Sequence, residues 1–269
     1  MRLEDKVAII IGGGQAPGES AAIGNGRATA LLFAREGAKL CCVDRSLESA
    51  QETADMIAKE GGTAIAAAAD VTDESAIETA IKTCANEWGR LDILHNNVGI
   101  SVEGGDATLD KISTEAFERI FDVNLLGTML ACKHALPIMR DQKSGAIVNI
   151  SSASAYWTGH PTVLYPASKM AMISFTRQIA MQNADTGVRA NVILPGLMDT
   201  PMAVDRRVEV TGRTRDDIAS ERHSKVPLLN KMGTGWDVAH AALFLASDDA
   251  GFITGVELPV DGGSMARVG

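Results

Sequence analysis

Tyr165 and Lys169 are the pair of side chains in this sequence with the clearest chemical potential. Residues four apart share one face of a helix, and Pro166 between them is tolerated if it lies in the first helical turn. An ammonium next to a phenol favours the ionised phenol, whose pKa must fall from about 10 toward neutrality for useful proton transfer. The spacing indicates a general base at Tyr165. A core tyrosine beside a solvated lysine would fit the same spacing.

Ser152 precedes Tyr165 by thirteen residues and stands at the end of an expected strand, in Asn149-Ile150-Ser151-Ser152. Its hydroxyl could polarise a carbonyl held near the phenol. A serine at a strand end also serves as a simple cap, so Ser152 gains meaning only together with Tyr165 and Lys169.

A glycine cluster follows the first expected strand. Gly12, Gly13 and Gly14 come directly after that strand, and Gly24-Asn25-Gly26 opens a helix. Glycines let the backbone approach a pyrophosphate, whose charge is held by free N–H groups at a helix N-terminus. A flexible turn is the alternative interpretation, which the strand and helix context disfavours.

Asp44 ends the second expected strand. A carboxylate there accepts hydrogen bonds from both adenosine ribose hydroxyls and repels a 2′-phosphate, which favours NAD over NADP. Arg45 beside it would soften this preference. Asp44 would also fit the simple start of a turn.

The elements that must position these residues alternate along the chain. Strands joined by helices lie parallel, and uniformly apolar strands are buried on both faces. We therefore expect a doubly wound, Rossmann-type α/β fold with a parallel sheet, in a single domain over residues 1–269. Expected strands are 7–11, 40–43, 63–68, 91–94 and 146–150, and expected helical stretches are 27–36, 75–88, 113–140 and 163–180.

Local capping signals support the expected helices. Ser46 and Thr72 stand where N-caps are needed, and Thr234 with Asp237 has the spacing of a capping box.

Composition limits the kind of protein. The chain has 269 residues, 46% apolar and 22% charged, as in soluble globular proteins. Its net charge of −9 repels nucleic acid and anionic membranes, so neither is an expected partner. No apolar run could span a bilayer, and the charged start from Met1 to Lys6 is unlike a signal peptide, so we expect a cytoplasmic protein. Its four cysteines show no metal or disulfide spacing and are expected to be buried; no metal is expected.

Taken together, these residues resemble the short-chain dehydrogenase/reductase family, specifically its shorter single-domain branch. The resemblance runs over nearly the whole chain. It implies a catalytic tetrad in which Asn124 joins Ser152, Tyr165 and Lys169. In that family, Asn124 would support a water-linked proton path to the lysine, and Lys169 would also bind the nicotinamide ribose.

The resemblance also implies further cofactor contacts. Asp70-Val71 resembles the family's adenine-binding pair, and Asn97 with Gly99 lies in a turn resembling Asn-Asn-Ala-Gly. The segment from Pro195 to Met202 resembles the family's nicotinamide-binding segment: the backbone at Met198 would hold the carboxamide and Thr200 would assist. The implied cofactor residues are Gly12, Gly14, Gly24, Asn25, Gly26, Asp44, Asp70, Val71, Asn97, Gly99, Tyr165, Lys169, Pro195, Met198 and Thr200.

The sequence departs from the family pattern in three places. Ile11 replaces a threonine and Val98 replaces a smaller alanine, neither of which touches the chemistry. The glycine loop matches only if Ala16 to Ile23 is an insertion, and Pro17-Gly18 within it predicts an ordered bulge. The sequence therefore does not determine which groups of this loop contact the phosphates.

The substrate pocket is expected to include Ser154, Trp157, His160 and Leu197, although His160 fits a structural role equally well. Residues 200–228 are charge-rich and are expected to form a substrate lid within the domain. Arginines in this lid would suit an anionic substrate, but acidic neighbours favour a solvated, self-paired helix. The arginines are Arg206, Arg207, Arg213, Arg215 and Arg222.

We interpret the sequence as an NAD-dependent oxidoreductase that moves a hydride between a secondary alcohol, or a diol, and the nicotinamide. A 3-oxoacyl or other ketone reductase is the alternative, disfavoured because such enzymes commonly use NADPH. A non-catalytic NAD-binding regulator would not need the filled tetrad. By resemblance the expected oligomer is a homotetramer or a dimer built on two long helices.

Overall fold

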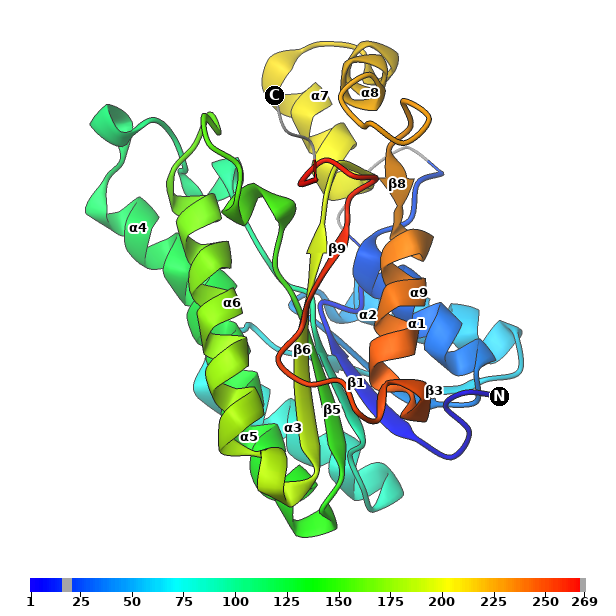
Figure 1. The fold of residues 1–269 in the computed structure, drawn as a ribbon. Helices are drawn as coiled ribbons and strands as arrows, with labels where there is room; N and C mark the ends of the chain where they lie inside the picture. Colours follow the sequence, from blue (N-terminus) through cyan, green and yellow to red (C-terminus); the bar gives the residue numbers. More distant parts are fainter. Residues whose placement is uncertain (16–20, 267–269) are drawn as a thin grey trace.

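The structure, a computed structural model, describes residues 1–15 and 21–266. Within these residues seven parallel strands form one sheet in the order β3-β2-β1-β4-β5-β6-β9 (Figure 1). This confirms the expected doubly wound α/β fold. The strands are β1 (Val7–Ile11), β2 (Lys39–Asp44), β3 (Thr63–Ala68), β4 (Ile93–Asn96), β5 (Gly145–Ile150), β6 (Val188–Pro195) and β9 (Glu257–Val260).

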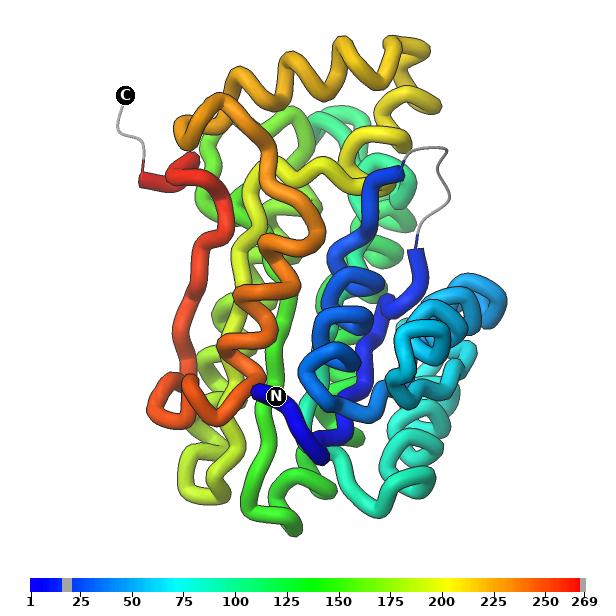
Figure 2. Tube along the Cα trace, turned by 90° about the vertical axis from the view of Figure 1, so that its right-hand side faces the viewer, coloured from blue at the N-terminus to red at the C-terminus, as the bar shows by residue number. Residues whose placement is uncertain are grey.

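Helices cover both faces of the sheet (Figures 1 and 2). One face carries α1 (Asn25–Arg35), α2 (Leu47–Lys59) and α9 (Gly235–Ala246). The other carries α3 (Glu74–Trp88), α5 (Gly127–Gln142) and α6 (Leu164–Gln182), and α4 (Thr114–Phe121) packs beside α6.

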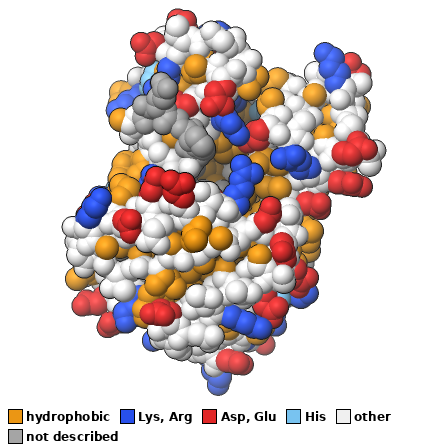
Figure 3. Space-filling view, turned by 180° about the vertical axis from the view of Figure 1, so that it is seen from behind, with side chains coloured by type: hydrophobic (Ala, Val, Ile, Leu, Met, Phe, Trp, Pro, Cys, Tyr) orange, Lys and Arg blue, Asp and Glu red, His pale blue; other side chains and the backbone are white. Residues whose placement is uncertain are grey.

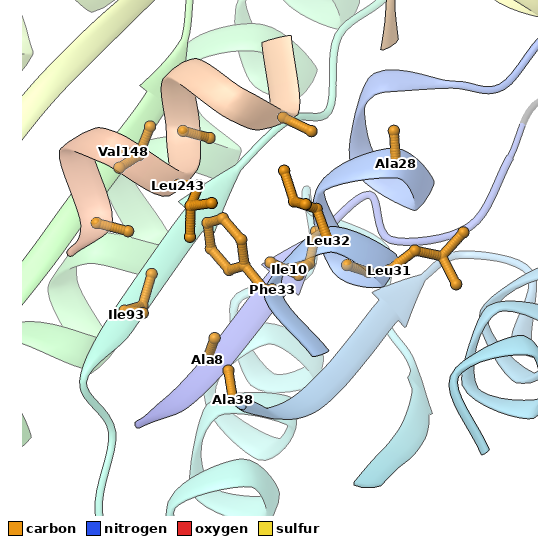
Figure 4. Close-up of a cluster of buried hydrophobic side chains, with 14 of the residues drawn as sticks. Ala8, Ile10, Ala28, Leu31, Leu32, Phe33, Ala38, Ile93, Val148 and Leu243 are labelled. Carbon is orange, nitrogen blue, oxygen red and sulfur yellow. The ribbon is translucent and has the colours of Figure 1, made fainter. Parts of the chain in front are cut away.

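Alternating side chains of β1 separate the two hydrophobic cores. Ala8 and Ile10 belong to the core under α1 and α9, whereas Ile9 belongs to the core under α3 and α5. In the first core, Phe33 of α1 lies close to Leu243 of α9 (Figure 4). Successive residues of a strand point to opposite faces, so every residue of β1 is buried.

Some boundaries differ from the sequence-based expectations. β4 lies two residues later than expected, because Leu91 and Asp92 form the approach to the strand. The long helix expected from Ser113 to Arg140 is interrupted by a π-helical turn, Asp122–Leu126. The N-cap of α3 is Asp73 rather than Thr72, since the Asp73 carboxylate accepts from Ser75 N and Ala76 N.

Other local expectations are confirmed. Ser46 caps α2, its hydroxyl accepting from Ser49 N at 3.3 Å. The Thr234 N–H donates to the Asp237 carboxylate at 2.7 Å, as a capping box requires. All four cysteines are buried and free. Within the described residues, no helix is both long enough and apolar enough to cross a membrane.

The strand order places a switch point between β1 and β4, from which successive strands run in opposite directions across the sheet. Ligands of open α/β sheets bind at the carboxyl ends of the strands near such a point. Above those ends stand α7 (Arg206–Thr211) and α8 (Arg215–His223), joined to the sheet through a short pair, β7 (Met198–Asp199) and β8 (Gly233–Thr234) (Figure 1). We call residues 200–228 the lid segment.

Candidate active site

Tyr165 and Lys169 lie in the first two turns of α6, and the Lys169 side chain reaches the carboxyl end of β5. The Lys169 side chain is only 2% exposed, and its Nζ donates to the Ile150 carbonyl at 2.9 Å. The same Nζ is 5.7 Å from the centre of the Tyr165 ring. Burial lowers the pKa of Lys169 to about 8, because an ammonium loses hydration in this setting.

The phenol of Tyr165 behaves differently from the sequence-based expectation. Burial raises its pKa, and a hydrogen bond with Ser152 opposes that rise without overcoming it. The net pKa of the phenol is therefore raised, not lowered as expected, because the loss of hydration outweighs the groups that oppose it. The Lys169 ammonium is bonded to the backbone of β5 and lies beside the ring, and a lowering effect of Lys169 on the phenol stays a prediction.

Ser152 follows β5 and points toward the phenol. Its Oγ accepts hydrogen bonds from Ser154 N at 3.1 Å and from Ser154 Oγ at 2.9 Å. Its own proton therefore remains for donation, which stabilises an oxyanion at Tyr165 or on a substrate. Ser154 is 3% exposed, so in this structure it orients Ser152.

Asn124 lies in the π-helical turn between α4 and α5 and is completely buried. Its amide accepts from Ile100 N at 2.7 Å and donates to Ile100 O at 2.9 Å and to Ser168 Oγ at 2.9 Å. Ser168 in turn donates to the Tyr165 carbonyl at 2.8 Å. Asn124 thus ties the loop after β4 to the helix that carries Tyr165. A π-turn at a functional position is a common arrangement.

Asp106 is a residue of the site that the sequence did not reveal. It is 4% exposed, and its carboxylate accepts from the N–H groups of Val163 (3.2 Å), Leu164 (2.9 Å) and Tyr165 (2.8 Å). It therefore caps α6 from a distant loop and fixes the backbone at Tyr165. No local signal exists, because the cap and the helix are 59 residues apart for Tyr165.

Two further residues, Gly99 and Ser151, determine the surroundings of Lys169. A Cβ on Gly99 would lie 3.0 Å from Lys169 Nζ, so the absence of a side chain there leaves room for the ammonium. Ser151, which was not among the expected site residues, donates to the Lys169 carbonyl at 2.7 Å. The strand end of β5 thus positions α6 through the backbone.

The glycine loop after β1 is close-packed. Gly12 has φ +84°, a conformation that favours glycine, and a Cβ on Gly26 would lie 1.9 Å from the Gly12 carbonyl oxygen. A Cβ on Gly14 would lie 2.7 Å from a carboxylate oxygen of Asp44. Asn97 Nδ2 donates to Gly12 O at 3.3 Å, linking the end of β4 to this loop.

The N-terminus of α1 has the donors that a diphosphate needs. Gly24 is the N-cap and supplies no side-chain cap, and no acidic residue lies in the first turn. Asn25 Oδ1 is a buried acceptor for which the described residues supply no hydrogen-bond partner. The free N–H groups of this helix end and the side-chain-free cradle fit the diphosphate end of a nicotinamide dinucleotide, whereas the Asn25 oxygen needs a donor and not a phosphate.

Only part of the predicted insertion can be located. Ala16 to Ser20 lie outside the described residues, and so does the bulge predicted at Pro17-Gly18. Gly24 N donates to Gln15 Oε1 at 2.9 Å, which brings the two sides of the insertion together. Ile23 packs on the core under α1.

Asp44 ends β2, and Asp70 follows the neighbouring strand β3 by two residues. Asp44 accepts from Gly14 N and from Ser46 N, both at 3.2 Å. The contact with Ser46 N shows that Asp44 also starts a turn, which was the alternative interpretation of this residue. Asp70 accepts from Thr72 N at 2.9 Å, and hydrogen bonds from Thr72 hold its pKa below the usual value. Val71 is 7% exposed and packs where α5 begins.

The segment after β6 combines backbone pairing and capping. Pro195 ends β6, and Met198 lies in β7, where its carbonyl accepts from Arg222 Nη2 at 3.4 Å. Thr200 Oγ1 accepts from Ala203 N at 3.3 Å and so caps the turn that opens the lid segment.

The expected substrate residues do not all face one space. His160 Nδ1 contacts Thr162 O at 3.2 Å and Thr162 Oγ1 at 3.1 Å, which favours its structural role. Leu197 packs with a small core formed by four residues of the lid segment and by Met232; the four are Val204, Ile218, Ala219 and Val226. Trp157 is partly buried in the loop after β5.

The fold and this site define a Rossmann-type protein with a nucleotide cradle next to a Ser, Tyr and Lys cluster. A family model described as enoyl-(acyl carrier protein) reductase matches residues 20–265. The chain belongs to the short-chain dehydrogenase/reductase family. It is an oxidoreductase acting on CH–OH groups with a nicotinamide cofactor.

Relatives cover nearly the whole chain. A 2,5-dichloro-2,5-cyclohexadiene-1,4-diol dehydrogenase of Sphingobium indicum is 36% identical, over 97% of this chain and 97% of its own. A 3-oxoacyl-[acyl-carrier-protein] reductase of Thermotoga maritima is 34% identical, over 98% and 99%. The crystal structure of a Burkholderia xenovorans protein described as a short-chain dehydrogenase/reductase has a TM-score of 0.91 and 40% identity, covering 100% of this chain and 99% of that one.

Proposed function

We propose that the protein is an NAD-dependent dehydrogenase for secondary alcohols or diols, with Tyr165 as the group that exchanges the hydroxyl proton. The observation that carries this proposal is the meeting of Ser152, Tyr165 and Lys169 at the carboxyl edge of the sheet, beside the glycine cradle. The diol named for the Sphingobium indicum relative supports the inclusion of diols.

Each residue has one role in this mechanism. A nicotinamide cofactor held at the glycine cradle would supply the hydride chemistry. Ser152 donates a hydrogen bond to the substrate oxygen, and Tyr165 Oη takes the hydroxyl proton. Lys169 would hold the nicotinamide ribose. The Asn124 amide, used by Ile100 and Ser168, fixes the loop after β4 to α6, and the water path that the family resemblance implies for Asn124 stays a prediction. Since burial raises the pKa of Tyr165, alcohol oxidation should increase toward alkaline pH.

Reduction of a ketone, including a 3-oxoacyl substrate, is the second candidate. A phenol with a raised pKa is protonated at neutral pH and is ready to donate its proton to a carbonyl oxygen. The Thermotoga maritima relative carries the name of such a reductase. A non-catalytic NAD-binding regulator is disfavoured, because it would have no need for all four residues of the tetrad.

The test of the proposed reaction is a screen of NAD reduction with steroids, alditols, cyclic alcohols and diols at mildly alkaline pH. Tyr165→Phe keeps the ring but removes the proton acceptor. We expect turnover of any substrate found to fall by roughly 10² to 10⁴-fold while NAD affinity stays almost unchanged. A variant that keeps more than about a tenth of wild-type turnover would show that Tyr165 is not the base.

The proposed preference for NAD rests on Asp44, whose carboxylate lies at the end of β2 against the glycine loop. A 2′-phosphate there would meet a like charge. We expect NAD to be preferred over NADP by at least about tenfold, and Asp44→Ala to narrow that ratio. Steady-state kinetics with both cofactors measures it. Equal efficiency in the unmutated enzyme would contradict the assignment.

We also propose a homotetramer, or a dimer, built on the long helices α5 and α6. Both helices expose methionines: Met129 of α5 is 41% exposed, and Met181 of α6 is 72% exposed. Apolar side chains on neighbouring helices are typical of a subunit interface.

A further inference from the structure

The five arginines of the lid segment fall into two groups. Three form ion pairs: Arg206 with Glu209, Arg213 with Glu221, and Arg215 with both Asp199 and Asp205. For these three the expected self-paired helix surface is confirmed. Arg207 and Arg222 form no ion pair with any described carboxylate, although they belong to the same charged segment.

Arg222 is a partly buried cation with little compensation. Its Nη2 donates to the Met198 carbonyl at 3.4 Å and its Nε to the Met232 sulfur at 3.3 Å, a weak acceptor. Burial lowers its pKa to about 10, and the nearby positive charge of Arg207 acts in the same direction. A guanidinium that remains charged here is stabilised if a bound anion completes its surroundings.

Arg207 is the second arginine of the lid segment without an ion pair to a described carboxylate. Its Nη1 folds back onto the Ala203 carbonyl at 2.5 Å, at the turn that follows Thr200. Its charge lowers the pKa of Tyr165 and that of Arg222, so its guanidinium lies within electrostatic reach of both. In the view from behind, Lys or Arg side chains lie at the margin of a hollow between the lid side and the α4 side (Figure 3).

Three acidic groups act on Tyr165 or on Arg222: Glu103, Asp199 and Glu221. Glu103, in the turn Val102–Gly104 after β4, is exposed, and its charge raises the pKa of Tyr165. The charges of Asp199 and Glu221 raise the pKa of Arg222. Both carboxylates are already paired, Asp199 with Arg215 and Glu221 with Arg213 and Lys225. Two unpaired arginines against one exposed glutamate leave an excess of one positive charge, which matches a monoanion better than a phosphate dianion.

We propose that Arg222 and Arg207 bind a carboxylate of the substrate, so that the substrate class is a hydroxy acid or the corresponding oxo acid. The planar guanidinium fork matches the two oxygens of a carboxylate. This proposal rests on the proposed function, because it assigns the far end of a substrate whose carbinol lies at Tyr165 and Ser152. It reverses the sequence-based preference, which treated all five arginines alike.

The cofactor diphosphate is the competing ligand for these arginines. The diphosphate cradle is formed at Gly12 and at the N-terminus of α1, after the first strand. Arg222, in contrast, bonds the carbonyl of Met198 in the segment after β6. A diphosphate role would appear as a changed cofactor KM, which the experiment below measures.

The experiment compares acids with their neutral esters. Acetoacetate and methyl acetoacetate, and 4-oxopentanoate and its methyl ester, are reduced with NADH by the wild type, Arg222→Met, Arg207→Met and Arg213→Met. We expect the wild type to prefer an acid over its ester at least tenfold in kcat/KM. That ratio should fall at least tenfold in Arg222→Met and severalfold in Arg207→Met, and be retained in Arg213→Met, whose arginine is paired with Glu221.

Arg207 is exposed, so its variant tests the inference without disturbing the lid core, and Arg222→Lys should recover part of the ratio. Ester reduction that equals or exceeds acid reduction would leave the proposed function intact and overturn the carboxylate site. The carboxylate site would also be overturned if Arg222→Met raised the NADH KM and left the acid-to-ester ratio of kcat/KM unchanged. It would likewise be overturned if dihydroxyacetone phosphate were reduced with a higher kcat/KM than both acids.

If no ketone is reduced, the proposed reaction is wrong. Isothermal titration calorimetry then tests the carboxylate site independently, by measuring the binding of the acids. Binding of the acids to the enzyme–NADH complex that is lost in Arg222→Met would support a carboxylate site. Absence of acid binding to the wild type would overturn it.

Discussion

Among single residues, Lys169 is one whose proposed role in catalysis lowers the stability of the fold. Its ammonium is buried and is bonded to one carbonyl, that of Ile150. The folded pKa of about 8 lies below the ordinary 10.5, so between these values the unfolded chain binds more protons. The stability cost is therefore complete below about pH 8 and is lost as the pH rises toward 10.5.

The variant Lys169→Met should remove this cost, because methionine carries no charge. From pH 7 to pH 10, the free energy of unfolding of the wild type should rise by about 2 kcal/mol relative to that of the variant. Urea unfolding at both pH values measures the difference, and Lys111→Met, at an exposed lysine, should show none. If the difference in the free energy of unfolding between the wild type and Lys169→Met did not change with pH, the Lys169 ammonium would not be desolvated in the folded protein. The variant should also lose activity and bind NAD more weakly.

At the scale of elements, the N-terminus of α6 determines where Tyr165 stands. Local caps such as Ser46 on α2 follow from neighbouring residues. The first turn of α6 instead takes its acceptor from Asp106, in the loop between β4 and α4. Asp106 in this loop therefore positions the phenol through the backbone at the start of α6.

Asp106→Ala should leave three N–H groups of α6 without an acceptor. We expect a loss of stability of about 1–2 kcal/mol, typical of a lost cap, together with a severalfold or larger fall in kcat. Asp73→Ala, which removes the cap of α3, is the matched control and should cost similar stability without changing kcat. Asp106→Asn should recover part of kcat. Equal kcat in both alanine variants would limit Asp106 to a structural role.

At the scale of the whole molecule, the sheet and its two helical layers form a single body. The face formed by α5 and α6 exposes three methionines. Met129, Met170 and Met181 are 41%, 36% and 72% exposed. Burial of such a face against a second copy is the reason for proposing an oligomer.

Met129→Glu should place a charge in that interface. We expect the protein to shift from a tetramer, or a dimer, to smaller species in light scattering coupled to gel filtration. Leu47→Glu is the control, because Leu47 of α2 is 51% exposed on the opposite face of the sheet. A monomeric wild type, or an unchanged assembly in Met129→Glu, would contradict an interface at α5 and α6.

The sequence by itself determined the parallel sheet and the bounds of several elements. β1 and β3 were predicted with their exact ends, because short apolar runs bounded by glycine or aspartate have a local signature. It also predicted that Ser152, Tyr165 and Lys169 act together, since strand ends and helical spacing are properties of neighbouring residues.

Only the tertiary structure decided what depends on distant residues. Asp106 reaches α6 across the fold, and the π-turn at Asn124 interrupts a periodic helix without a sequence signal. The pKa of Tyr165 and the unpaired state of Arg222 follow from burial and from which charges come near, neither of which is encoded locally. Spacing along a chain fixes contacts within an element, whereas burial and long-range pairing exist only once the elements have packed.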